Sequence, residues 1–414
     1  MDFAFPDQTQ TLQQCLRDFM SHHVLPLNNE FLRIAETGEY PLALIEGLKE
    51  KAKAEALWNL FLPGLRSHEP GTRLSNLEYA PLAEIMGRLP WASEVFNCNA
   101  PDTGNMELLH LFATPEQSER WLLPLLNGDI RSCFAMTEPD VASSDASNIT
   151  TSIRREGEEY VISGRKWFIT GAIHPNCNLC IVMGVTDEGG DAHHRHSMVL
   201  VPMDTPGLRI VRNVAIMNHH SPEGHCELLF ENVRVPVSNL LGEQGKGFAL
   251  AQARLGPGRV HHCMRTVGQC ELALELMCER SLTRRAFGKH LSDFSNVQDW
   301  IAHSRVEIDQ VRLLVLRAAW TMDKLGNAAA RVDVSAIKVA AANLQTRVLD
   351  RAIQVFGAMG LTPDTPLAFL WTWGRALHFI DGPDEVHLRT IARDELGKAR
   401  TTLGSTAAYY SNPS

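Results

Sequence analysis

The sequence lacks several features that would assign it to an easily recognised class. It has no basic excess, since 39 Lys and Arg face 48 Asp and Glu, and the net charge of −9 argues against a nucleic-acid partner. No apolar run approaches the roughly 18 residues of a membrane span. The opening MDFAFPDQTQ looks like neither a secretory signal nor an Arg-rich transit peptide. Nine cysteines is an odd number for a disulfide framework, so we expect a reducing, cytoplasmic location.

What is present predicts an α+β chain in three parts. The 414 residues are 44% apolar, and length alone suggests domains of about 150 residues each. Residues 1–130 have helical periodicity, and Thr114-Pro115 has the pattern of an N-cap followed by the first residue of a helix. Residues 131–239 contain six or seven short β-branched runs, enough for a compact β-barrel or sandwich.

Helical periodicity returns over residues 240–414. It is interrupted at 256–258 by Gly-Pro-Gly and resumes in three further stretches, the last from Leu367 to about Leu403. Four long helices with short links predict an antiparallel four-helix bundle. Helices, then strands, then helices in one chain mean that the β unit is inserted between two helical units.

Two strings end predicted strands and carry polar groups. FAMTEPDVASSD begins at Phe134, and KWFITGA begins at Lys166. Hydroxyls and backbone N–H groups beside an apolar shoulder can hold a large ligand that is polar at one end and flat at the other. Taken alone, the first string is equally consistent with an ordinary turn at the end of a strand.

Taken together, the strings TEPDVASSD, KWFIT, RRAFGKHL, QVFGAMG and DGPDEVH resemble the acyl-CoA dehydrogenase family in order and spacing, from about Asn76 to Lys398. The resemblance implies that family's fold, an FAD cofactor, oxidation of an acyl-CoA in lipid β-oxidation, and an electron-transfer flavoprotein as acceptor. The alternatives are an oxidase on the same scaffold and a non-catalytic acyl-CoA-binding protein.

The resemblance also implies an FAD site built from two subunits. Thr137 and Thr170 would hydrogen-bond the flavin ring, and Phe168 would pack against it where family members usually have Trp. The further residues expected at the same FAD are Phe134, Met136, Ser143, Ser144, Pro383, Asp384 and Glu385. A second group of residues would reach the FAD of a neighbouring subunit, namely Arg284, Phe287 and Gln354. We therefore expect a homodimer or homotetramer.

The catalytic base implied by the resemblance is Asp381, at a position where many members have Glu. A second family position for the base lies within ARLGPGR, which offers no carboxylate, and Asp384 and Glu385 are alternatives for which helix capping is the simpler role. Within the family the chain resembles the type ten and type eleven subgroup, which is associated with 4-hydroxyacyl-CoA breakdown through a 4-phosphate. The expected substrate-binding residues are Arg254, Arg259, His261 and Gly382.

Two cysteine- or histidine-rich strings have simpler interpretations than metal binding. Cys177 and Cys180 form a lone C-x-x-C at the head of an apolar strand, which favours packing. The string DAHHRH, residues 191–196, follows two glycines and favours a solvated loop. We therefore expect no metal site.

Overall fold

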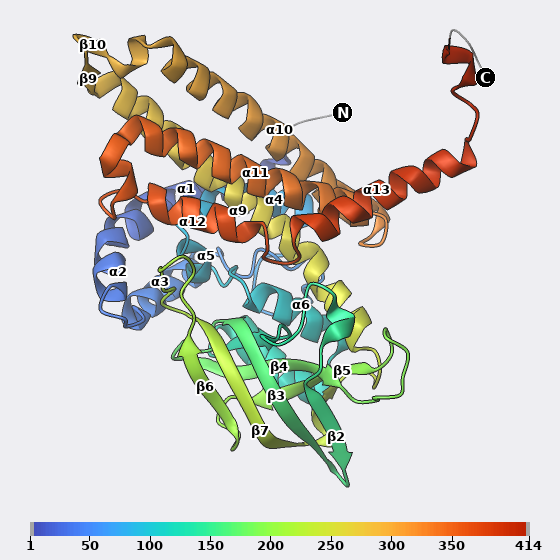
Figure 1. Ribbon diagram of the computed structural model, residues 1–414. Helices are drawn as coiled ribbons and strands as arrows, with labels where there is room; N and C mark the ends of the chain where they lie inside the picture. The colour runs from blue at the N-terminus through green and yellow to red at the C-terminus, as the bar shows by residue number, and fades with distance from the viewer. Residues whose placement is uncertain (1–3, 411–414) are drawn as a thin grey trace.

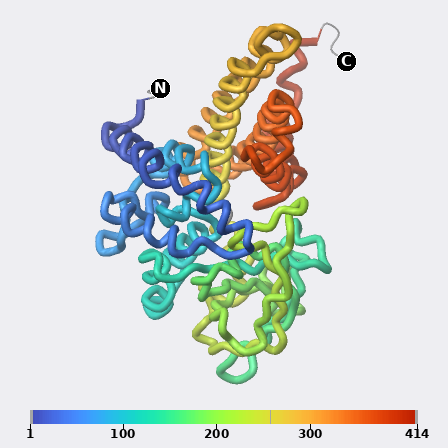
Figure 2. The backbone as a smooth tube through the Cα atoms, turned by 90° about the vertical axis from the view of Figure 1, so that its left-hand side faces the viewer, coloured from blue at the N-terminus to red at the C-terminus, as the bar shows by residue number. Residues whose placement is uncertain are grey.

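The computed structural model describes residues 4–410, apart from the side chains of residues 255 and 257. The N-terminal helices lie beside the C-terminal helices, and the β-sheet lies below both (Figures 1 and 2). Thr114 caps the helix that begins at Pro115, with Gln117 completing a capping box, as predicted. The N-terminal helices are α1 (Asp7–Phe19), α2 (Asn28–Ala35), α3 (Leu42–Ala54), α4 (Asn76–Gly87), α5 (Ala92–Val95), α6 (Asp102–Phe112), α7 (Pro115–Gln117) and α8 (Leu123–Asn127).

The middle of the chain forms one eight-stranded sheet in the order β6-β7-β3-β2-β4-β5-β8, with β1 parallel to β4. Strand β3 contains KWFIT and is long, because it continues through Gly164, where register shifts against β7 bend it. The strands are β1 (Arg131–Ala135), β2 (Ser152–Glu156), β3 (Glu159–Thr170), β4 (Cys177–Val185), β5 (His196–Pro202), β6 (Leu208–Asn213), β7 (His225–Pro236) and β8 (Leu240–Leu241).

The first helix of the C-terminal region, α9 (Gly247–Thr283), is continuous, so the interruption expected at residues 256–258 is wrong. Proline inside a helix costs about 3 kcal/mol, and close packing on neighbouring helices can offset that cost. A Cβ atom at Gly268 would overlap the backbone of Glu84 on α4, which shows how closely these two helices cross. The helices that follow are α10 (Ser295–Leu325) and α11 (Arg331–Phe356), and a small hairpin of β9 (Arg285–Ala286) and β10 (Lys289–His290) precedes them.

The expected last helix is two helices, α12 (Leu367–Leu377) and α13 (Asp384–Thr401), joined by a sharp turn. Asp381 and Gly382 have positive φ angles of 56° and 106°, and Pro383 stands at the N-cap of α13. A right-handed helix cannot pass through two such residues, so the chain turns here. Within residues 4–410, no helix is long and apolar enough to cross a membrane.

Candidate active site

A buried ion pair fixes the loop that follows β1. Lys166 is fully buried, and its Nζ donates to the carbonyl oxygens of Met136 (2.8 Å) and Met183 (2.7 Å) and to Oε1 of Glu138 (2.9 Å). Burial lowers the pKa of Lys166 to about 8, although Glu138 opposes that shift. Burial acts to raise the pKa of Glu138, but Lys166 and the hydroxyl of Thr151 outweigh it and hold the value at about 2. Both groups are therefore charged at neutral pH.

The end of β1 and the end of β3 are held side by side. The hydroxyl of Thr137 donates to the carbonyl of Trp167 (2.6 Å), and the N–H of Trp167 donates to the carbonyl of Thr137 (3.0 Å). The predicted strings TEPDVASSD and KWFIT thus meet where β1 ends beside the last residues of β3. The Oγ of Ser143 accepts from the N–H of Glu138 (2.8 Å), and this hydrogen bond holds the loop formed by the first string. The next residue, Ser144, is exposed.

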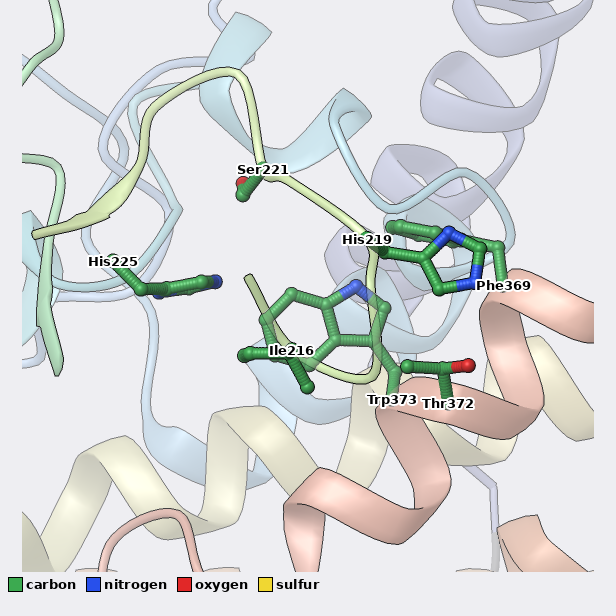
Figure 3. Close-up of a pocket in the computed structure, with 7 residues that line it drawn as sticks. All are labelled: Ile216, His219, Ser221, His225, Phe369, Thr372 and Trp373. Atoms are coloured by element: carbon green, nitrogen blue, oxygen red, sulfur yellow. The ribbon is translucent and has the colours of Figure 1, made fainter. Parts of the chain in front are cut away.

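Thr170, the last residue of β3, contacts His225 at the start of β7, with 3.0 Å between Oγ1 and Nδ1. His225 points across a small pocket toward Trp373 of α12, and the ring centroids are 5.3 Å apart (Figure 3). Burial lowers the pKa of His225 to about 4, and among the described residues its Nε2 has no hydrogen-bond partner. His225 is therefore neutral, and its polar contact is with Thr170.

The strand-end residues have the chemistry of a flat ring site with polar edges. Phe168 is 44% exposed on a backbone with a φ of 54°, so its ring is free to cover a ligand. Thr137 and Thr170 add hydroxyls, and Phe134 adds an apolar face that carries the guanidinium of Arg254 at 4.1 Å from its ring centroid. This combination fits a flavin, which pairs an aromatic ring with hydrogen-bonding edges.

Asp381 lies in the turn between α12 and α13 and is held through both its side chain and its backbone. Oδ2 lies 3.2 Å from Nε2 of His262, and the two side chains are 21% and 23% exposed. The backbone carbonyl accepts from Nε of Arg259 (3.0 Å) and contacts Nε2 of His387 at 3.3 Å. A Cβ atom at Gly382 would lie 3.0 Å from that same His387 nitrogen, so glycine suits both the space and the φ angle.

Positive charge surrounds the Asp381 carboxylate. Burial acts to raise its pKa, but the hydrogen bond from His262 and the charges of Arg259 and Arg254 hold the pKa below its usual range. Arg254 is positioned by Asn105, whose Oδ1 accepts from its Nε at 2.8 Å. Arg254 packs on Phe134 of the flavin loop, and its positive charge acts on the carboxylate in the turn.

The structure does not support a substrate contact for His261. This side chain is 2% exposed and lies edge-on between the rings of Tyr79 and Phe61, at centroid distances of 4.7 and 6.2 Å. A side chain with so little accessible surface leaves no room for a ligand atom. His262, the next residue, contacts Asp381 instead.

Asp384 is tied to the turn rather than free, since its Oδ2 lies 2.6 Å from Nδ1 of His378 and its N–H donates to the carbonyl of the same residue at 3.1 Å. Glu385 is exposed in the first turn of α13. The acidic pair therefore stands at a helix N-terminus, where the backbone dipole favours carboxylates.

The residues expected to serve a neighbouring subunit lie far from this site. Arg284 is exposed, Phe287 is 96% exposed, and Gln354 is exposed at the end of α11. The β9–β10 hairpin beside Arg284 stands at the end of the helical bundle that is opposite the sheet (Figure 1). Arg284 and Phe287, which lie at this hairpin, therefore cannot reach the strand-end loops of their own chain.

The cysteine pair lies in the core of the sheet, because Cys177 and Cys180 are buried free thiols on β4. In the loop after Val185, His193 and His194 are exposed, whereas His196 is buried and contacts the carbonyl of Ile149 at 3.0 Å. No group of three or more His, Cys, Asp or Glu within the described part of the chain could hold a metal ion.

The sequence matches the N-terminal, middle and C-terminal domains of acyl-CoA dehydrogenase over residues 6–129, 133–233 and 245–396. It is 53% identical to FadE2 of Mycobacterium tuberculosis over 98% of this chain and 99% of that protein. It is 48% identical to acyl-CoA dehydrogenase family member 11 of Rattus norvegicus, over 95% of this chain but only 51% of that protein. It is 53% identical to member 10 of Mus musculus, over 93% of this chain but only 36% of that protein.

Solved structures agree with these matches. A Mycobacterium abscessus structure has 49% identity and a TM-score of 0.90 over 96% of this chain and all of its own. Butyryl-CoA dehydrogenase from Megasphaera elsdenii has 27% identity and a TM-score of 0.81 over 96% of this chain and 100% of that chain. The chain therefore belongs to the acyl-CoA dehydrogenase family, and the protein is an FAD-dependent oxidoreductase.

Proposed function

We propose that the protein removes hydrogens from the α and β carbons of an acyl-CoA thioester and that Asp381 is the base that takes the α-proton. Bound FAD supplies the acceptor for the β-hydride. The observation that carries the proposal is the position of Asp381, in a turn where Arg259 donates to its backbone carbonyl and where it feels the charge of Arg254, which packs on Phe134 of the strand-end loops. The thioester would lie beside Arg259 and Gly382, between that turn and the flavin.

The backbone at residue 381 gives a physical reason for aspartate where many family members have glutamate. Its φ is 56°, and Asp and Asn enter this left-handed region several times more readily than most residues. A free carboxylate with a low pKa is a weak base. Binding of the acyl chain would exclude water from the side chain, which is 21% exposed, and so raise its pKa toward the range useful for proton abstraction.

The FAD site is proposed to consist of the strand-end loops of one subunit and residues of another. The first group is Phe134, Met136, Thr137, Ser143, Ser144, Phe168, Thr170, Pro383, Asp384 and Glu385. Arg284, Phe287 and Gln354 would serve the neighbour in a homodimer or homotetramer, which their exposure and distance from the first group support. An electron-transfer flavoprotein would then reoxidise the flavin. The nine free thiols are compatible with a cytoplasmic setting.

The substrate is proposed to carry a phosphate ester at C4. A phosphate buried beside an acyl chain needs cationic partners, because an unpaired buried charge is costly. Arg254 can supply one, since it is held by Asn105 at the junction between Phe134 and Asp381. His261, the other expected partner, is packed in the core and leaves Arg254 as the principal candidate.

Anaerobic bleaching of the bound flavin by a panel of acyl-CoAs tests this function. We expect bleaching with acyl-CoAs and a faster rate with 4-phosphoacyl-CoA than with the unsubstituted chain of equal length. The Arg254→Leu variant is expected to lose that preference, whereas Arg154→Leu, on an exposed part of β2, is expected to keep it. Equal rates for the two chains in the wild type would remove the 4-phosphate proposal. Hydrogen peroxide release during turnover would indicate an oxidase, and protein that cannot be loaded with flavin would indicate a binding protein.

A further inference from the structure

His262 is the side chain in direct contact with the carboxylate of Asp381, and the proposed reaction has so far given it no part. It lies three residues after Arg259 on α9, so the two side chains share the face of that helix that meets the α12–α13 turn. Nε2 of His262 lies 3.2 Å from Oδ2 of Asp381. Among the described residues no hydrogen bond involves Oδ1 of Asp381, so the two carboxylate oxygens are not equivalent.

The other ring nitrogen determines the protonation state of this imidazole. Nδ1 of His262 lies 3.4 Å from Nη2 of Arg265, and a guanidinium can only donate. Arg265 is itself fixed, because it is 9% exposed and its Nη1 donates to the carbonyl of Cys98 at 3.3 Å. Nδ1 must therefore be the acceptor. Nε2 then carries the hydrogen, and it donates to Oδ2 of Asp381.

A second proton on His262 would put an N–H group against the N–H groups of Arg265. Most of the charged groups around the pair are positive. Arg265 of α9 and Lys338 of α11 act on His262, and Arg254 and Arg259 of α9 act on Asp381. The start of α13 adds the neutral imidazole of His387 and one carboxylate of opposite sign, Asp384. Burial is the main cause that lowers the pKa of His262, and Arg265 and Lys338 lower it further, against the opposing effect of Asp381. The imidazole is neutral at physiological pH.

We infer that His262 is a positioning residue of the reaction: as a neutral donor it fixes Oδ2 of Asp381 and leaves Oδ1 to receive the substrate α-proton. This inference rests on the proposed role of Asp381 as the base. The hydrogen bond from His262 fixes the position of the Asp381 carboxylate, and the aspartate side chain is short, so it has few other positions from which to contact the substrate. It also stabilises the ionised form, so Asp381 stays ready to accept a proton well below neutral pH.

The pH dependence of anaerobic flavin reduction tests the inference. In His262→Leu the donor is lost, so the acid limb of the rate profile should move upward by at least about one pH unit. In His262→Gln the amide N–H₂ can donate to Asp381 and the amide oxygen can accept from Arg265, so the profile should stay close to that of the wild type. His303→Leu removes an exposed imidazole on α10 and should leave the profile unchanged.

An unchanged acid limb in His262→Leu would overturn the inference. Loss of flavin reduction at every pH in both His262 variants, with FAD still bound, would also overturn it, because His262 would then be the base itself. A separate readout is the ¹⁵N NMR spectrum of histidine-labelled protein, in which we expect His262, identified by its loss in His262→Gln, to be protonated at Nε2 only. A doubly protonated ring at pH 7 would contradict the assignment. If no acyl-CoA bleaches the flavin while this tautomer is observed, the proposed function fails and the contact between the two side chains stands.

Discussion

The buried ion pair of Lys166 and Glu138 predicts a large effect from one substitution. In Lys166→Met the side chain keeps its approximate length and loses its charge, so Glu138, which is 3% exposed, becomes an uncompensated buried carboxylate. The carbonyls of Met136 and Met183 also lose their donor. Removing one partner of a buried pair costs about 3–5 kcal/mol, so we expect the free energy of unfolding in urea to fall by that amount.

The same substitution should weaken FAD binding, because Lys166 holds the carbonyl of Met136 next to Thr137 in the flavin loop. Glu138→Gln in the Lys166→Met background should recover part of the stability, because it removes the uncompensated charge. Its single amide oxygen can still accept from one of the two N–H groups, of Thr150 or of Thr151, that now donate to different oxygens of Glu138. A double variant whose loss equals the sum of the two single losses within about 0.5 kcal/mol would refute this reasoning. The control is Lys53→Met, which breaks a surface pair with Glu50 and should cost less than about 1 kcal/mol.

Three further predictions concern acid stability, helix crossing and the cofactor. Burial lowers the pKa values of His225 and His387 to about 4, so between about pH 6.5 and pH 4 the unfolded chain binds protons that the folded chain does not. The free energy of unfolding in urea should therefore fall over that range by up to about 3 kcal/mol for each histidine. A flat pH profile would contradict this. Gly268→Ala should lower the melting temperature because its Cβ meets the backbone of α4, whereas Gly397→Ala on α13 has open space and should not. Arg284→Gln should speed FAD release, measured by flavin fluorescence, and an unchanged rate would count against a contact with a neighbour's cofactor.

Much of the arrangement follows from local sequence patterns. The strings that begin at Phe134 and Lys166 were expected at strand ends, and they stand at the ends of β1 and β3, where Thr137 and Trp167 meet. Alternation of apolar and polar residues, and the turn residues after each strand, carry that information. What the pattern could not supply is the pairing of β1 with β4 and of β3 with β7, which depends on contacts distant in sequence.

The active-site turn was missed because apolar periodicity continues across it from Leu367 to Leu403. The signal against a continuous helix was the Gly382-Pro383 pair, which favours a break. The error at His261 has another cause. Arg254 and His261 are seven residues apart and lie on the face of α9 that meets the N-terminal helices, but Tyr79 covers that face at His261. Which face a helix presents to a pocket is a tertiary property.

The most direct test of the account is anaerobic mixing of acyl-CoA with FAD-loaded Asp381→Asn protein, followed at the flavin absorbance band. The amide keeps the shape of the side chain, tolerates the left-handed backbone at residue 381, and lacks a basic oxygen. We predict that FAD remains bound and that flavin reduction is at least about a hundredfold slower than in the wild type, as expected for loss of a general base. A reduction rate close to that of the wild type would contradict the assignment of Asp381 as the base.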